Sequence, residues 1–211
     1  MKHVPVGVPD SPAVPGRLLA ISDLHVSHPR NRQWVAGLPP GSPGDWLLVA
    51  GDLAEKVEDI AWALGTLRSR YGTVVWVPGN HDLWAHPRDP VKLRGEARYQ
   101  HLLALCRELG VITPEDPYPV WTGAGGPAVI VPLFLLYDYT FRPDGTSTKA
   151  EALDLAYRTG VIGTDERHLH PDPVPEPGGV VPGQDRRDPA PAGRARPGAA
   201  DHPGQPFPAD P

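Results

Sequence analysis

Three short segments of the chain carry side chains that bind divalent metals. They read "DLH" at 23–25, "GD" at 51–52 and "GNHD" at 79–82. Carboxylate, amide and imidazole donors together suit a borderline divalent metal such as Mn, Fe, Ni or Zn. Two such ions, about 3.5–4 Å apart, clamp the attacking and leaving oxygens of a phosphate ester and lower the pKa of bound water. These residue types therefore predict metal-assisted attack of water on a phosphate ester.

Each of these segments ends a short apolar run, and the three runs read "RLLAISDLH", "DWLLVAGD" and "VVWVPGNHD". Continuous apolar runs of this length are typical of strands that are covered on both faces. In an open α/β sheet, ligands gather at the carboxyl ends of the strands. Asp23 and His25 are two residues apart, so at a strand end they can face the same side. The three strands would thus bring the metal-binding side chains to one edge.

Helical periodicity appears after the second and third runs and makes the class α/β. We expect a helix within 55–72 and another within 89–110, the second with a proline near its start. The apolar stripe of the first helix contains Val57, Ile60, Ala61, Leu64 and Leu67, and that of the second contains Leu102, Leu105, Cys106 and Leu109.

The segment 118–141 predicts a hairpin around the glycine-rich turn at 123–126. A helix follows within 146–160, capped by Thr146 or Ser147 and ended by Gly160. The aromatic residues between the two elements allow two interpretations. They line a cap over the site, or they belong to the core and the hairpin. These residues are Tyr137, Tyr139 and Phe141.

Composition limits the class of protein. The net charge of −5 gives no electrostatic reason to expect nucleic-acid binding. Cys106 is the sole cysteine, so the chain has no disulfide framework, and we expect this thiol to be inert in the core. The start lacks the apolar region of a signal peptide, and the longest apolar run has ten residues, too few to span a bilayer. We therefore expect a cytoplasmic protein without a membrane segment. The sequence does not indicate its oligomeric state.

The chain divides into three parts by composition. We expect residues 1–16 to be a disordered arm and residues 17–170 to form the folded domain. Residues 171–211 contain 12 prolines and 6 glycines but no leucine or isoleucine. Such a segment buries too little apolar surface to offset its ordering entropy, so we expect a disordered tail.

The three motifs resemble those of the calcineurin-like metallophosphoesterase family, whose pattern is D-x-H, then G-D, then G-N-H-[DE]. The resemblance implies a two-sheet sandwich flanked by helices, incomplete at its C-terminal side in this chain. It also implies that Asp23 and His25 hold one metal, that Asp52 bridges two, and that Asn80 binds the second. By the same resemblance His81 faces the phosphate, where it stabilises charge and protonates the leaving oxygen. Glu55 or Asp82 would hold its imidazole in the charged form.

Each residue also has a purely structural interpretation. Asp23 could cap a helix, Asn80 could serve a turn, and Asp52 after Gly51 could start another turn. The ordered occurrence of all three motifs favours the metal site.

The family pattern continues with later histidine motifs, including a final G-H-x-H, that this sequence lacks. "RHLH" at 167–170 has neither the preceding glycine nor a strand that leads into it. One hypothesis is a frameshift: moving the reading frame of 173–184 by one base permits "PYPSREAWCRA", which is similar to bacterial members of the family. On this basis we expect a phosphoester hydrolase that is impaired in the present form. The alternative is a non-catalytic scaffold that keeps the fold and binds a partner.

Overall fold

The computed structural model describes residues 16–173, and it contains a three-stranded parallel sheet of order β1-β2-β3. The strands are β1 (Leu18–Ile21), β2 (Trp46–Ala50) and β3 (Thr73–Val77). Leu18 pairs with Trp46, and Trp46 pairs with Thr73. Because the strands are parallel and in step, their carboxyl ends lie side by side. All three predicted strands are confirmed in position, but the expected cover on both faces is not found among the described residues, because Leu18 and Ala20 of β1 are exposed.

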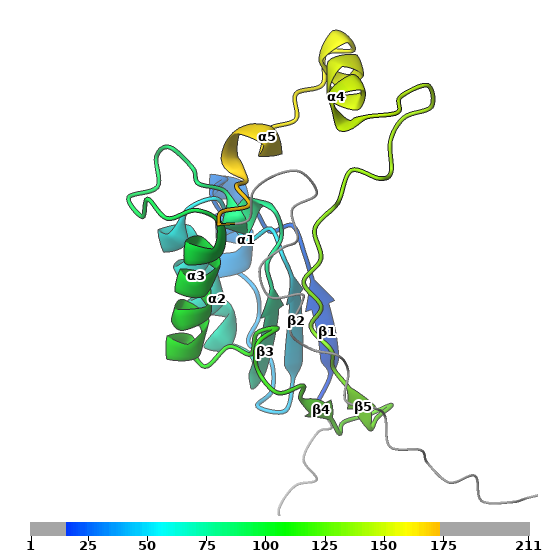
Figure 1. Ribbon diagram of the computed structural model, residues 1–211. Helices are drawn as coiled ribbons and strands as arrows, with labels where there is room; N and C mark the ends of the chain where they lie inside the picture. The colour runs from blue at the N-terminus through cyan, green and yellow to red at the C-terminus, as the bar shows by residue number, and fades with distance from the viewer. Residues whose placement is uncertain (1–15, 174–211) are drawn as a thin grey trace, which may run out of the picture.

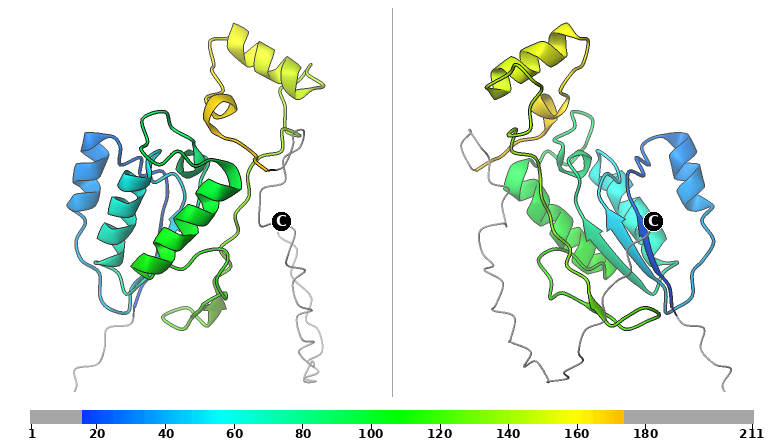
Figure 2. Two further views of the ribbon diagram at one scale, coloured as in Figure 1. Left: turned by 60° about the vertical axis from the view of Figure 1, so that its left-hand side comes forward. Right: turned by 90° about the vertical axis from the view of Figure 1, so that its right-hand side faces the viewer.

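Three helices cover one face of this sheet (Figure 2). They are α1 (Pro29–Ala36), α2 (Val57–Arg68) and α3 (Gly95–Leu109). Helical periodicity predicted α2 and α3, whereas α1, which has one buried residue, Val35, was not predicted. The core lies between the helices and the sheet, where Ile60, Leu64 and Trp76 are fully buried. Cys106 is buried there as expected, and burial raises the pKa of its thiol to about 12.

One detail of each of the predicted helices α2 and α3 was wrong. The second predicted helix begins at Gly95 and not near residue 89, because Asp89 instead accepts hydrogen bonds from the amides of Val57 and Val91. In α2 the buried stripe contains Ala63, whereas the predicted Ala61 is half-buried.

A short antiparallel sheet follows, formed by β4 (Val120–Trp121) and β5 (Ala128–Val129), and it confirms the predicted hairpin. Within residues 16–173 these two strands are the whole of the second sheet. Trp121 packs edge-on against Trp46 of β2, with ring centroids 5.4 Å apart. From β5 the chain runs along the sheet to its other end (Figure 1).

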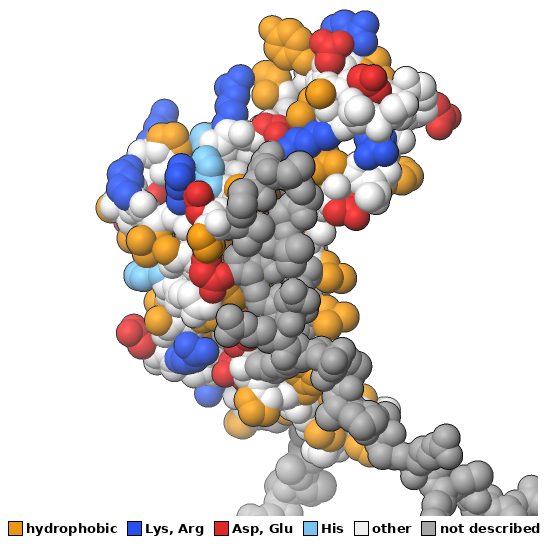
Figure 3. Space-filling model, viewed as in Figure 1, with side chains coloured by type: hydrophobic (Ala, Val, Ile, Leu, Met, Phe, Trp, Pro, Cys, Tyr) orange, Lys and Arg blue, Asp and Glu red, His pale blue; other side chains and the backbone are white. Residues whose placement is uncertain are grey.

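Two helices lie beyond the carboxyl ends of the parallel strands (Figure 1), α4 (Lys149–Arg158) and α5 (Asp165–His168). Thr148 caps α4 in a capping box with Glu151, so the predicted caps Thr146 and Ser147 were wrong. The segment 149–168, which we call the α4–α5 lobe, carries acidic and basic side chains next to one another (Figure 3). Because α4 and α5 lie beyond the carboxyl ends of the strands, the lobe stands over the edge where the sequence predicted the metal site.

Among the residues that the structure describes, no helix is long and apolar enough to cross a membrane. The predicted N-terminal arm and C-terminal tail lie outside the described residues, apart from their boundary positions.

Candidate metal centre

The carboxyl ends of β1 and β2 bring three of the predicted ligands together. One possible ligand atom from each of Asp23, His25 and Asp52 lies within 4.8 Å of the others. The backbone fixes this arrangement, because the amide of Asp23 donates to the carbonyl of Gly51 over 3.2 Å and that of His25 to Asp52 over 3.0 Å. The loop after β1 is thus tied to the loop after β2 at the residues that carry the side chains.

These three residues also share an uncommon backbone conformation. Their φ angles are 56° at Asp23, 40° at His25 and 55° at Asp52. Residues other than glycine seldom adopt positive φ, because Cβ then crowds the backbone at a cost of about 1–3 kcal/mol each. Such strain persists only where the surroundings impose it, and it gathers at functional sites. Tyr139 is the one further non-glycine residue with positive φ among the described residues, so three of the four lie at these strand ends and support the site there.

Two glycines allow the second and third strand ends to approach each other. A Cβ on Gly79 would lie 2.1 Å from Oδ1 of Asp52, and one on Gly51 would lie 2.5 Å from the amide nitrogen of Gly79. Oδ1 of Asp52 also accepts a hydrogen bond of 3.0 Å from the amide of His81. The carboxylate of Asp52 is therefore held between the loops after β2 and β3, as a bridging ligand would need to be.

Asp82 serves the backbone and not the imidazole of His81. Its buried carboxylate accepts hydrogen bonds of 2.8–3.2 Å from four amides, those of Asp52, Leu53, Ala54 and Gly79. Burial raises the pKa of Asp82 to about 7, while the amide donors oppose that shift. Of the two candidate partners for His81, Asp82 instead binds the loop that follows β2.

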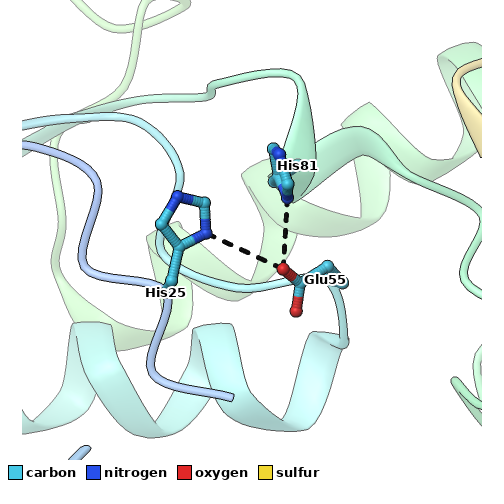
Figure 4. A group of neighbouring side chains, drawn as sticks. All are labelled: His25, Glu55 and His81. Carbon is cyan, nitrogen blue, oxygen red and sulfur yellow. Dashed lines mark hydrogen bonds and ion pairs between the residues drawn. The ribbon is translucent and has the colours of Figure 1, made fainter. Parts of the chain in front are cut away.

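Glu55 is the carboxylate that faces the imidazole rings (Figure 4). Its Oε1 atom lies 3.1 Å from Nδ1 of His81 and 3.7 Å from Nδ1 of His25. Ser27 donates a hydrogen bond of 2.7 Å to the other oxygen. Burial acts to raise the pKa of Glu55, but the hydrogen bonds from Ser27 and His81 outweigh it and bring the pKa below its ordinary value.

The ring of His81 is also fixed from its flat side. Trp84 stacks on it with centroids 3.8 Å apart and planes 27° apart. His25 meets it edge-on, at 4.7 Å between centroids. The imidazole of His81 is therefore held by Glu55, Trp84 and His25, an orientation suited to proton transfer at a defined point.

Asn80 lies at the same edge, and a residue that sequence reasoning missed holds its side chain. Its Nδ2 atom donates to Oδ1 of Asp165 over 2.9 Å and to Oδ2 over 3.1 Å. The two residues are 85 positions apart, and no periodic pattern in the sequence links them. The one indication in the sequence that a later segment reaches this edge was the interpretation of Tyr137, Tyr139 and Phe141 as a cap over the site.

The cap interpretation describes Tyr137 and Tyr139 better than the core interpretation does, and neither interpretation describes Phe141. Tyr137 donates to Asp165, and Tyr139 donates to Glu166, so both contact α5. Phe141 is fully exposed. Of the segment "RHLH", His168 has its ring centroid 5.3 Å from that of Trp84, and among the described residues it belongs to neither group of possible ligands.

The residues fit a divalent metal by their chemistry. Two carboxylates and one imidazole within 4.8 Å form a mixed oxygen and nitrogen donor set, and the oxygen of Asn80 would extend it. A second group, His25, Glu55 and His81, also has its donor atoms within 4.8 Å. His25 belongs to both groups and therefore links the candidate ligands Asp23 and Asp52 to Glu55 and His81.

Comparisons with known proteins point to one family. A family model described as calcineurin-like phosphoesterase matches residues 16–155. The "[Acyl-carrier-protein] phosphodiesterase PptH" of Mycobacterium tuberculosis is 54% identical over 158 residues, which are 75% of this chain and 49% of that protein. The crystal structure of phosphopantetheinyl hydrolase (PptH) from Mycobacterium tuberculosis has a TM-score of 0.74 and 52% identity, covering 77% of this chain and 57% of that one. The chain therefore spans about half the length of the curated relative that it matches.

Proposed function

This chain belongs to the calcineurin-like phosphoesterase family, and from that premise we propose that its site hydrolyses a phosphodiester with the help of two divalent metal ions. The observation that carries the proposal is the convergence of Asp23, His25 and Asp52 within 4.8 Å. Their positive φ angles add support, because strained backbone is retained where function requires it.

Each residue has a distinct role in this proposal. Asp23 and His25 would hold one ion, Asn80 would offer its amide oxygen to the other, and the carboxylate of Asp52 would serve both. When bound, the ions activate water and neutralise charge on the phosphate. His81 stabilises that charge and delivers a proton to the leaving oxygen. Glu55 orients His81 through Nδ1, which leaves Nε2 for the substrate.

We propose a phosphopantetheinyl group carried by an acyl carrier protein as the substrate. The support is the printed description of the relative as an acyl-carrier-protein phosphodiesterase, together with 54% identity over the matched residues. In such a substrate a phosphodiester joins the prosthetic arm to the carrier, and water would cleave it into a phosphomonoester and a hydroxyl. The proton released to the leaving oxygen is the one that we assign to His81.

We expect the 211-residue chain to bind metal weakly and to turn over slowly. The family pattern includes later histidine motifs that this sequence lacks, so each ion would lack part of its ligand set. The same feature favours the second candidate function, a scaffold that retains the fold and binds a partner without catalysis. Two tightly held ions and rapid hydrolysis of an aryl phosphate would contradict the expected impairment.

The test uses the full chain with Mn²⁺ and holo-acyl carrier protein, followed by mass spectrometry of the carrier. Slow loss of the phosphopantetheine mass, abolished by EDTA and by Asp52→Asn, would support the proposed activity. Asp154→Asn on the exposed side of α4 removes the same charge far from these ligands and serves as the matched control. A carrier that binds but keeps its mass over a long incubation would favour the scaffold.

A further inference from the structure

Asp165, from the α4–α5 lobe, accepts hydrogen bonds from three side chains around the metal centre. Asn80 donates through Nδ2, Trp84 through Nε1 and Tyr137 through its hydroxyl. We propose that Asp165 is a positioning residue for Asn80, which turns the amide so that its oxygen faces the metal. This inference rests on the proposed function, because it assigns a role toward the same ions.

The two ends of the Asn80 side-chain amide differ in hydrogen bonding and hardly at all in shape. They are nearly equal in size, but one is an acceptor and the other carries two donor hydrogens. Packing alone therefore does not distinguish them, and the hydrogen-bond partner does. An ionised carboxylate only accepts, so it selects Nδ2 and directs Oδ1 to the opposite side. Only that oxygen can bind a cation.

The carboxylate of Asp165 must itself be held, and the neighbouring side chains do this. Trp84 is stacked on His81, so its Nε1 atom is fixed with respect to the site. Tyr137 reaches the same carboxylate from the segment that precedes α4. All three contacts to Asp165 come from donors, which is the pattern expected for an acceptor-only group.

The position of α5 depends in turn on the rest of the lobe. The next residue, Glu166, pairs with Lys149 at the start of α4 over 2.9 Å and accepts from the hydroxyl of Tyr139. The amide of Ala85 donates to the carbonyl of His168 over 2.7 Å and ties the end of α5 to the loop after β3. The lobe is thereby linked to one ligand of the metal centre.

Two substitutions separate hydrogen bonding from charge. Asp165→Leu removes every acceptor and leaves Nδ2 of Asn80 without its partner. Asp165→Asn keeps one carbonyl oxygen for Asn80 and Trp84, and the hydroxyl of Tyr137 can turn to accept from the new amide. If Asp165 positions Asn80, the leucine variant should lose affinity for the metal and the asparagine variant should keep it. Asp154→Asn in the same lobe is the control, because its exposed carboxylate pairs only with Arg158 among the contacts found.

The measurement is Mn²⁺ binding to the full chain, followed through the electron paramagnetic resonance signal of free Mn²⁺. The Mn²⁺ ion that no longer binds to Asn80→Ala is the one to which Asn80 contributes a ligand. We expect Asp165→Leu to lower the affinity for that ion by about 10–100-fold, which is the usual effect of removing the hydrogen-bond partner of a metal ligand. Asp165→Asn and Asp154→Asn should bind Mn²⁺ with an affinity close to that of the wild-type chain. An unchanged affinity in Asp165→Leu, or a gain, would overturn the inference, as would an equal loss in Asp165→Asn.

A second measurement does not depend on the metal. The side-chain amide signals of Asn80, assigned by their absence in Asn80→Ala, should exchange slowly with water in the apo chain and faster in Asp165→Leu. If the wild-type chain binds no Mn²⁺, the metal site fails and this role fails with it. If the wild-type chain binds Mn²⁺, and Asp165→Leu changes neither the Mn²⁺ affinity nor the exchange of the Asn80 amide, then only the positioning role is wrong. Asp165→Ala, which also lacks an acceptor, replaces the leucine variant if the latter does not fold.

Discussion

Nδ1 of His81 lies 3.1 Å from Oε1 of Glu55, and this contact determines which ring nitrogen is free for chemistry. Because Glu55 engages Nδ1, the nitrogen left for proton transfer is Nε2. The same oxygen of Glu55 lies 3.7 Å from Nδ1 of His25, so one carboxylate serves a predicted ligand and a predicted catalytic residue. Glu55 thus connects the metal centre to the proton donor.

Removing His81 should change the titration of Glu55. Burial acts to raise the pKa of Glu55, and the hydrogen bonds from Ser27 and His81 hold it below its ordinary value. In His81→Ala one of these opposing contacts disappears, so we expect the pKa of Glu55 to rise. Carbon NMR of the side-chain carboxyl group, titrated in the absence of metal, measures this. His101→Ala on α3 is the control, and an identical pKa in both variants would contradict the assigned contact.

Gly79 should tolerate no side chain, whereas Gly65 should accept one. A Cβ on Gly79 would lie 2.1 Å from the carboxylate of Asp52, but a Cβ on Gly65 within α2 would lie 3.9 Å from Cδ2 of Leu109, an ordinary van der Waals contact. We expect Gly79→Ala to lower the free energy of unfolding by about 1–3 kcal/mol through overpacking. Gly65→Ala should raise it by about 0.5–1 kcal/mol, because alanine favours the helix.

Urea unfolding of both variants checks this pair of predictions. Each variant is the control for the other, because the same glycine-to-alanine change is expected to lower the free energy of unfolding at one position and to raise it at the other. A Gly79→Ala chain as stable as the wild type would show that the loops after β2 and β3 can move apart.

The strand ends were predictable because the signal is local. Each apolar run and the polar residues that end it are contiguous, and parallel pairing brings the ends together without further information. The ligands Asp23, His25 and Asp52 could therefore be located from the sequence. Their positive φ angles could not, because few residues other than glycine adopt that conformation and no sequence pattern marks the positions that do.

The contacts that the sequence did not reveal are those made across long distances. Asp165 reaches Asn80 over 85 positions, and a single aspartate in a polar segment has no periodicity to mark it. Arg98 was missed because an arginine on a helix is ordinarily exposed, yet here its side chain is fully buried. Such residues are recognised only once the fold places an acceptor beside them.

Stability in acid should depend on the pair formed by Arg17 and Asp45. The hydrogen bonds of the Arg17 guanidinium hold the pKa of Asp45 well below its usual range. A carboxylate with a lowered pKa stabilises the fold above its unfolded pKa of about 4, and that contribution is lost as the pH falls toward the folded value. We expect Asp45→Asn to be less stable than the wild type at pH 7, with the gap closing below pH of about 4.

Urea unfolding of the wild type and Asp45→Asn at a series of pH values gives this gap directly. The wild-type curve should bend downward in acid more steeply than that of the variant. A gap of constant size down to the lowest pH at which the chain folds would show that the amide contacts, and not the charge of Asp45, supply the stability.

Arg98 should be among the costliest residues to replace, because it joins α3 to the site from inside the core. Its guanidinium donates to the carbonyls of Asp82 and Glu55 and pairs with Asp89 over 2.9 Å. Both side chains of the pair are fully buried. Arg98→Met would leave a buried carboxylate without its counter-charge, so we expect a loss of about 3–5 kcal/mol in the free energy of unfolding.

Two further variants determine whether the charge is the cause. Arg107→Met on the exposed side of the same helix should change the free energy of unfolding by less than about 0.5 kcal/mol. Adding Asp89→Asn to Arg98→Met should recover part of the loss, because the neutral amide can still accept from the amide of Val57 without a buried charge. If the double variant is no more stable than Arg98→Met, the loss comes from the two backbone carbonyls. In that case the role of Arg98 is to hold the loops that carry Glu55 and Asp82.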